Sequence, residues 1–189
     1  VLDKAVGNIL RVIHNHTEQE SKKNDFIAND LLAEEIAEDC AILMKNDGIL
    51  PLKQDESFFI VGELFEKMRY QGAGSSMINP TFLTTPKNAF DNAKVKYKYC
   101  KGYKENQISI DKTLIDEAIQ AVENYNQVIA FIGLTDYVES EGCDRENMNL
   151  PDNQIALVDA LIKTGKKIII VLYGGSPIEI PFADKVNAI

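Results

Sequence analysis

The segment from Asp136 to Asp152 concentrates side chains that could carry out acid–base chemistry. It contains six carboxylates and a single basic residue, Arg145, and it follows the apolar run VIAFIG at residues 128–133. In one interpretation it is a solvated loop whose like charges repel each other only weakly in water. In another, a glutamate here is a general acid/base whose pKa is raised by burial and by neighbouring carboxylates. A metal site is disfavoured, because the spacing is not that of an EF-hand loop and no histidine is near.

A second loop with possible chemistry follows the apolar run FFIVG at residues 58–62. Its tip, QGAGSS at residues 71–76, could bring backbone N–H groups close to an oxygen-rich ligand. The glycines do not follow the strand in the GxGxxG pattern and no Gly-Lys-Ser/Thr is present, so both nucleotide-binding fingerprints fail. A glycine loop that only connects two elements is the alternative.

The elements that would carry these loops alternate along the chain. Short apolar runs predict strands at residues 58–62, 95–99, 128–133, 167–175 and 186–189. Apolar residues at helical spacing predict helices at residues 111–124 and 151–164. This alternation is typical of a three-layer α/β/α sandwich with a mostly parallel sheet. Functional residues of such folds gather beyond the carboxyl ends of the strands, where both loops would lie.

The amino-terminal part of the chain has a different pattern. Apolar residues at helical spacing predict one helix within residues 1–16 and another from residue 29 to about residue 44, separated by the polar stretch NHTEQESKKND. The chain begins without a methionine inside a helical pattern and stops within an apolar run. We therefore expect it to be a piece of a longer polypeptide.

Composition and charge restrict the class of partner. The net charge is -9, from 20 basic and 29 acidic residues, which provides no basic footprint for nucleic acid and would be repelled by an anionic membrane. No apolar run approaches the roughly 20 residues of a membrane span. The three cysteines form no CxxC pair, which favours a reducing compartment such as the cytoplasm. A neutral small molecule is the expected partner.

Several motifs together resemble glycoside hydrolase family 3, the β-glucosidase type. E-x-E-G-x-D-R at residues 139–145, then LP, Gln and G-S-P, is similar to the carboxyl-side α/β sandwich domain of that family. QGAGSS resembles its Q-G-x-G-S-S loop, and AEDCAILMKNDGILPL at residues 37–52 is similar to the stretch that introduces the domain. VLDKAVGNILRV at residues 1–12 resembles the last helix of the preceding barrel domain. The likeness therefore covers nearly the whole chain.

The resemblance implies a division of the chain into three parts. Residues 1–20 would be the last helix of a barrel domain that is otherwise absent, and residues 21–57 a linker with a connecting helix. Residues 58–189 would form the α/β/α sandwich domain, truncated at its carboxyl end.

The resemblance also implies a mechanism. In such enzymes a nucleophilic carboxylate of the barrel and an acid/base glutamate of the sandwich, roughly 5 Å apart, hydrolyse a terminal β-linked sugar with retention of configuration. Glu141, which precedes Gly142, would be the acid/base, with Glu139 as the alternative because loop length varies within the family. The expected partners are a small-molecule glycoside or oligosaccharide and the barrel domain of the same polypeptide, with no cofactor and no metal. Without the second carboxylate, the fragment alone is expected to be inactive.

Further residues of the two loops are expected to contact the substrate or the barrel. They are Arg69, Gln71, Ser75, Ser76, Asp144 and Arg145. Asp144 and Arg145 could instead brace their loop by an ion pair, and Arg145 could lower the pKa of a neighbouring carboxylate.

Two functions from other classes stay open on the residues alone. One is a non-catalytic domain of flavodoxin-like shape that binds a ligand or acts as a scaffold, in which the acidic loop is only surface. The other is an interaction module that docks on a barrel partner through the glycine loop.

Overall fold

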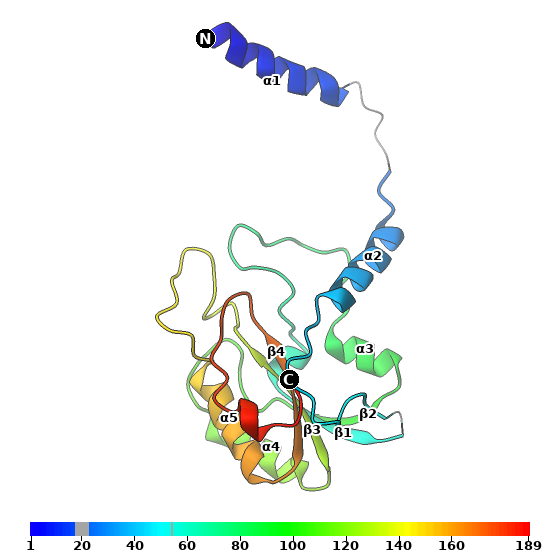
Figure 1. Ribbon diagram of the computed structural model, residues 1–189, viewed down its shortest axis with the longest axis vertical. Coiled ribbons are helices and arrows are strands. Elements are labelled where there is room, and N and C mark those ends of the chain that lie inside the picture. Colours follow the sequence, from blue (N-terminus) through cyan, green and yellow to red (C-terminus); the bar gives the residue numbers. More distant parts are fainter. Residues whose placement is uncertain (18–22, 54) are drawn as a thin grey trace. The chain divides into compact units, whose positions relative to one another are not determined.

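The computed structural model describes residues 1–17, 23–53 and 55–189 of the chain (Figure 1). These residues form two compact units, Val1–Ile42 and Leu43–Ile189. The polar stretch predicted to be a linker includes residues 18–22, which lie outside the described residues. None of the described helices has both the length and the apolarity needed to cross a membrane.

The first unit contains two helices, α1 (Leu2–Thr17) and α2 (Phe26–Asp39). α1 confirms the first predicted helix. α2 begins three residues earlier than predicted because Asp25 caps it, and its side chain accepts a hydrogen bond from the N–H of Ala28 at 3.0 Å.

The second unit is built on a four-stranded parallel sheet. In spatial order its strands are β2 (Lys96–Cys100), β1 (Ser57–Val61), β3 (Gln127–Gly133) and β4 (Lys167–Tyr173). β3 and β4 pair along their full length of seven residues. The apolar runs of β1 and β3 are almost completely buried, as a parallel sheet covered on both faces requires.

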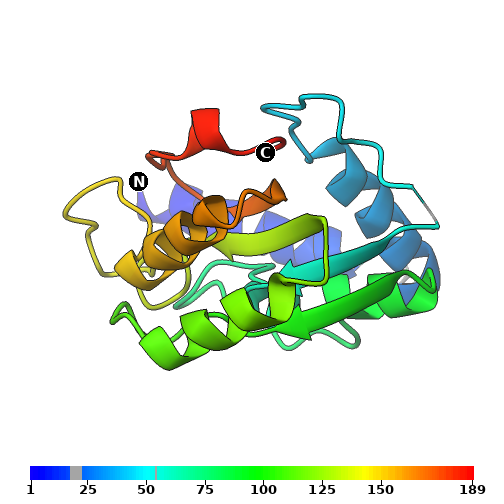
Figure 2. The same cartoon turned by 90° about the horizontal axis from the view of Figure 1, so that it is seen from below.

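Helices cover both faces of this sheet, so the predicted three-layer α/β/α sandwich is confirmed. The helices are α3 (Pro86–Asn92), α4 (Lys112–Val122), α5 (Asp152–Lys163) and two short 3-10 helices, η1 (Glu63–Phe65) and η2 (Ala183–Lys185). α4 and α5 lie side by side on one face (Figure 2). On the other face the Phe65 ring of η1 packs 5.0 Å from that of Phe131 in β3, and the Phe90 ring of α3 packs 6.3 Å from it.

The fifth strand predicted at residues 186–189 does not form. Instead, Ala188 makes two isolated bridges, one parallel to Ile169 of β4 and one antiparallel to Asn46. The segment therefore covers part of the outer edge of β4. The same arrangement explains why α2 ends earlier than predicted, because the N–H of Met44 donates to the last carbonyl of the chain at 2.9 Å instead of continuing a helix.

Glycines end β1 and β3 where the backbone passes close to a neighbouring strand. Gly62 has a φ of +113°, and a Cβ there would lie 2.0 Å from the carbonyl oxygen of Phe131. Gly133 has a φ of +151°, and a Cβ there would lie 2.0 Å from the carbonyl oxygen of Tyr173. The side-chain amide of Gln154 in α5 holds Gly133, accepting from its N–H at 2.7 Å and donating to its carbonyl at 2.9 Å. The loops after these strands thus leave the sheet in defined directions.

Candidate active site

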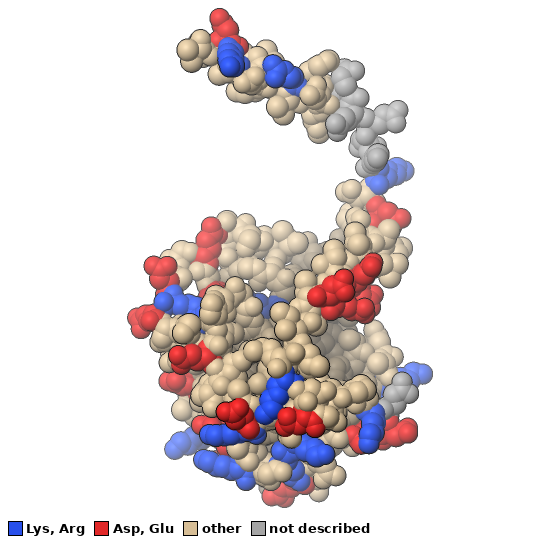
Figure 3. Space-filling view, viewed as in Figure 1, with Lys and Arg blue, Asp and Glu red and all other residues tan. Residues whose placement is uncertain are grey.

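Four loops leave the carboxyl edge of the sheet, because all its strands are parallel. They are residues 62–85 after β1, residues 101–111 after β2, residues 134–151 after β3 and residues 174–182 after β4. Both loops singled out by the sequence lie at this edge, as predicted. Acidic and basic side chains intermingle on the visible face of the second unit (Figure 3).

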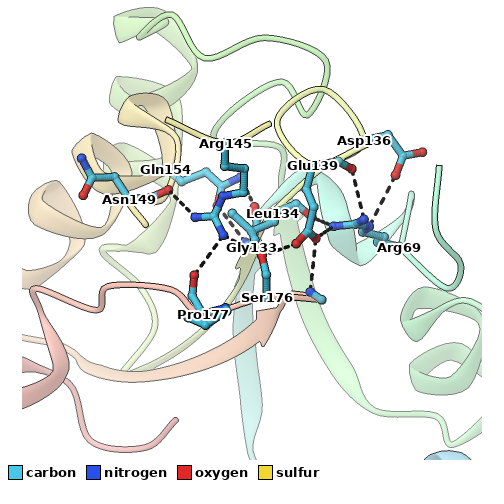
Figure 4. Close-up of polar contacts among 11 residues, drawn as sticks. Arg69, Gly133, Leu134, Asp136, Glu139, Arg145, Asn149, Gln154, Ser176 and Pro177 are labelled. Atoms are coloured by element: carbon cyan, nitrogen blue, oxygen red, sulfur yellow. Dashed lines mark hydrogen bonds and ion pairs between the residues drawn. The ribbon is translucent and has the colours of Figure 1, made fainter. Parts of the chain in front are cut away.

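Glu139 is surrounded by hydrogen-bond donors from the two neighbouring loops (Figure 4). Its carboxylate accepts from a guanidinium N–H of Arg69, from the hydroxyl of Ser176 and, at 3.2 Å, from the N–H of Gly175. Arg69 also donates to the backbone carbonyls of Glu139 at 3.1 Å and Leu134 at 3.2 Å. The Arg69 and Glu139 side chains are only 14% and 18% exposed. Glu139 therefore connects the loops after β1, β3 and β4.

These contacts keep Glu139 ionised. Burial favours its neutral form, but the hydrogen bonds from Ser176, Arg69 and Gly175 and the charge of Arg69 outweigh burial, so the pKa of Glu139 lies below its usual value. Both of its oxygens already accept hydrogen bonds within the protein. Glu139 is thus poorly suited to give a proton to a substrate.

Glu141 lies two residues further along the same loop and is exposed. Its Oε2 atom accepts a hydrogen bond from the backbone N–H of Ser75 at 2.6 Å, so it faces the glycine loop after β1. Gly74 permits this approach, since its φ is +90° and a Cβ there would lie 2.6 Å from the Cβ of Glu141. The two loops that the sequence singled out therefore meet at Glu141.

The predicted rise in glutamate pKa is wrong for both candidates in this chain. The side-chain and backbone donors of Ser75 lower the pKa of Glu141, because they stabilise the carboxylate and burial is too slight to oppose them. Among the described residues, the donors around Glu139 and Glu141 outweigh burial, and both pKa values lie below the usual value.

The tip of the glycine loop is organised by its own side chains. The amide of Gln71 accepts from the N–H of Ile78 at 2.9 Å, and donates to the carbonyl of Ile78 at 3.3 Å and to the hydroxyl of Tyr70 at 3.0 Å. A Cβ on Gly72 would lie 2.7 Å from the hydroxyl of Ser76, so Ser76 packs against this turn. Substrate contacts by Gln71 and Ser76 stay a prediction.

The predicted ion pair between Asp144 and Arg145 is wrong, since the described residues contain no such pair. Arg145 instead donates to the hydroxyl of Ser176 at 2.7 Å and to the carbonyls of Pro177 at 2.9 Å and Asn149 at 3.5 Å. Asp144 is exposed. The arginine that lowers a carboxylate pKa is Arg69, which acts on Glu139.

The sequence reasoning missed Ser176 as a member of the site. Its hydroxyl donates to Glu139 and accepts from Arg145, so it joins two residues of the loop after β3 to the loop after β4. The G-S-P motif that contains Ser176 was noticed only as part of the family likeness. Its position directly after the apolar run of β4 could have identified it as an edge residue.

Glu63, directly after β1, was also missed. It is only 3% exposed, and its carboxylate lies 3.0 Å from the ammonium groups of Lys67 and Lys101 and accepts from the N–H of Glu105 at 2.7 Å. Burial opposes ionisation of Glu63, but these hydrogen bonds prevail and lower its pKa. The group ties the loop after β1 to the loop after β2.

The edge is hollowed between the loops after β1, β2 and β3. A hollow of about 190 Å³ opens there. Its walls are formed by Leu64, Lys67, Met68, Arg69, Glu105, Thr135 and Asp136. Within the part of the chain that the structure describes, no three His, Cys, Asp or Glu side chains are grouped so that they could hold a metal ion.

Comparisons with known proteins agree with this fold. The family model of the glycosyl hydrolase family 3 C-terminal domain matches residues 41–189. Thermostable beta-glucosidase B of Acetivibrio thermocellus is 38% identical over the whole chain, which covers 26% of that protein. The exo-alpha-(1->6)-L-arabinopyranosidase of Bifidobacterium longum is 32% identical over 87% of the chain, which covers 23% of that protein.

Solved structures give the same result. A GH3 beta-glucosidase of Bifidobacterium adolescentis superposes with a TM-score of 0.88 at 30% identity, covering 96% of this chain and 27% of that protein. A GH3 exo-beta-xylosidase (XlnD) superposes with a TM-score of 0.65 at 27% identity, covering 78% of this chain and 19% of that protein. The chain spans about a quarter of the length of these two curated relatives.

Proposed function

Because the chain belongs to glycosyl hydrolase family 3 and carries its C-terminal domain, we propose that it is part of a retaining β-glycosidase in which Glu141 is the general acid/base. The resemblance read from the sequence motifs is confirmed by the family match. The two glutamates of the acidic loop differ in availability, and that difference supports the choice of Glu141.

The observation that carries the proposal is the contact between Glu141 and Ser75. It holds an exposed carboxylate over the glycine loop by a hydrogen bond of 2.6 Å. Glu139, the alternative, already accepts hydrogen bonds from Arg69, Ser176 and Gly175 on both of its oxygens. A group that must bind and release a proton at the substrate needs a free face, which Glu141 has and Glu139 lacks.

The reaction needs a second carboxylate, which we place in a barrel domain of the same polypeptide. The nucleophile attacks the anomeric carbon while protonated Glu141 gives its proton to the leaving oxygen, which forms a covalent glycosyl-enzyme. Glu141, now a carboxylate, then takes a proton from the water that displaces the nucleophile. Both carboxyl groups return to their starting state, and the sugar keeps its configuration.

The proposed nucleophile would also keep Glu141 protonated before the reaction. A nucleophilic carboxylate roughly 5 Å away raises the pKa of Glu141, because two negative charges disfavour each other at that separation. The N–H of Ser75 acts in the opposite sense, since it stabilises the carboxylate that Glu141 becomes after the first step. The nucleophile loses its charge when the glycosyl-enzyme forms, so the repulsion disappears and the pKa of Glu141 falls at the step where Glu141 acts as a base.

The substrate we propose is a small glycoside or oligosaccharide with a terminal sugar. Support comes from the names of the relatives, which include a beta-glucosidase, an exo-alpha-L-arabinopyranosidase and an exo-1,4-beta-xylosidase. The net charge of -9 is compatible with a neutral sugar. We do not assign Arg69 as a sugar contact, because its guanidinium is already bonded to Glu139 and Leu134.

The test is a comparison of leaving groups in the intact enzyme. Glu141→Gln should lower kcat/KM for an alkyl glycoside by roughly 10²- to 10⁴-fold and leave it nearly unchanged for a dinitrophenyl glycoside, since only the poor leaving group needs protonation. Glu139→Gln, the matched control, should separate the two substrates far less, because it can displace Glu141 but leaves its proton in place. If Glu139→Gln discriminates between leaving groups and Glu141→Gln does not, the assignment is wrong.

A further inference from the structure

The turn that carries Glu141 is held at both of its ends by one hydroxyl group. We call residues 139–145 the acidic turn. At its start, Glu139 accepts a hydrogen bond from Ser176, and at its end, Arg145 donates to the same Ser176 oxygen at 2.7 Å (Figure 4). Ser176 thus closes a ring between the acidic turn and the loop after β4.

Both ends of the acidic turn have support beyond Ser176. Arg69 bonds the carboxylate and the backbone carbonyl of Glu139, and Gly175 donates to that carboxylate at 3.2 Å. Arg145 also donates to the carbonyl of Pro177, next to Ser176, at 2.9 Å. Because these groups are partly buried and charged, breaking one contact leaves another group without its partner.

The middle of the acidic turn has far fewer contacts. Within the described part of the chain, the hydrogen bonds of residues 140–144 are the bond from Ser75 to Glu141 and one inside the turn, from the N–H of Cys143 to the carbonyl of Ser140 at 3.2 Å. Glu141 and Gly142 are exposed, and a Cβ on Gly142 would meet no atom of the described residues within 4 Å beyond its chain neighbours. The position of Glu141 therefore depends on Ser75 and on the two ends of the turn.

From this geometry we infer that Ser176 is a positioning residue for Glu141, which it reaches through Glu139 and Arg145 at the two ends of the acidic turn. The role rests on the acid/base function proposed above. Ser176 has no chemical step of its own. It keeps the carboxyl group of Glu141 at the place from which a proton can reach the glycosidic oxygen, and a displacement of about 1 Å at such a group can cost roughly 10²-fold in rate.

The test uses the intact enzyme and an alkyl glycoside as substrate. Ser176→Ala should lower kcat by roughly 10- to 100-fold with little change in KM, whereas Ser176→Thr, which keeps the hydroxyl, should recover most of the rate. In the Glu141→Gln background Ser176→Ala should cost less than about 2-fold, because a residue that acts through Glu141 loses its effect when Glu141 is gone. Thr164→Ala is the matched control, because it also removes a hydroxyl that makes a hydrogen bond, to the carbonyl of Leu161 at 2.6 Å. Thr164 follows the last residue of α5, whereas the loop after β3 leads into the first.

Three results would overturn the inference. They are an unchanged rate in Ser176→Ala, an equal loss in both backgrounds, or a loss that Ser176→Thr does not recover. If Ser176→Ala does not fold, Arg145→Gln tests the ring from its other end by the same comparison of backgrounds. A failure of Glu141→Gln to separate good from poor leaving groups would overturn the proposed function itself, and is recognised without any Ser176 variant.

Discussion

The acidic turn carries two glutamates in opposite surroundings, one at its start and one in its middle. Glu139 is 18% exposed and bonded to three donors from two other loops, whereas Glu141 is exposed and, among the described residues, bonded to Ser75 alone. Glu139 thus connects the loops and is not free to exchange protons with a substrate. In this protein the carboxylate with more hydrogen bonds is therefore a structural support, although it lies two residues from the proposed acid/base.

A similar difference separates the residues that end the strands, which are firmly held, from the outer residues of the loops, which are exposed. Gly62 and Gly133 end β1 and β3 against neighbouring carbonyls, and Gln154 holds Gly133 on both its N–H and its carbonyl. These contacts fix where the loops begin. Residues 74–84 and 141–144 are exposed, and we expect these parts of the loops to meet a second domain and a substrate.

The largest difference between the two glutamates is expected when Glu141 is removed and an added nucleophile makes its role as base unnecessary. In the intact enzyme Glu141→Ala should lower kcat for an activated aryl glycoside by roughly 10²- to 10⁴-fold, because water then attacks the glycosyl-enzyme without a base. Azide needs no base, so added azide should restore turnover and give a glycosyl azide of retained configuration, detected by NMR. Glu139→Ala should show no such rescue, and a rescue of Glu139→Ala alone would exchange the two roles.

A smaller effect is expected from the residue that lets the two loops approach. A Cβ at Gly74 would lie 2.6 Å from the Cβ of Glu141, so Gly74→Ala should displace Glu141 and lower kcat by roughly 10²-fold. Gly48→Ala is the matched control, because Gly48 has a similar φ of +86° but nothing within 4 Å of the added atom. Both substitutions should cost about 1–2 kcal/mol of stability through the positive φ. Equal kcat values in the two variants would show that the approach at Gly74 is not needed.

The smallest effect should appear in the pH dependence of stability. Since the folded-state pKa of Glu139 is lowered, its contribution is present above the unfolded pKa of about 4.3 and is lost as the pH falls through the folded value. Glu139→Gln should therefore reduce the free energy of unfolding at pH 7, and the difference from wild type should shrink below about pH 4. Urea denaturation at several pH values measures this, and a difference that stays constant down to pH 2 would contradict it.

Much of the scaffold could be predicted from the order of the residues. Continuous apolar runs and apolar residues at helical spacing predicted β1, β3, β4, α4 and α5 to within a few residues. A strand buried on both faces is a continuous apolar run, so it can be recognised without knowing which strands lie beside it. The end of α2 and the segment at residues 186–189 were predicted wrongly. Both depend on pairing between residues 44–46 and the last residues of the chain, which local patterns do not encode.

The candidate site was likewise predicted only in part. The motif E-x-E-G-x-D-R identified the loop and its two glutamates, and the glycine loop was correctly expected at the same edge of the sheet. The partners of these glutamates were not predictable, because Arg69 and Ser176 lie 70 and 37 residues away from Glu139. The expected ion pair between Asp144 and Arg145 failed for the same reason, since Arg145 bonds to the loop after β4.

The amino-acid sequence by itself determined the family, the class of fold and the loop that carries the acidic residues, because apolar periodicity and short motifs are local properties of the chain. Only the tertiary structure decided which glutamate is bound up in supporting contacts and which is exposed. The physical reason is that a carboxylate's pKa and freedom depend on donors within a few ångströms in space, and in this protein those donors come from distant loops.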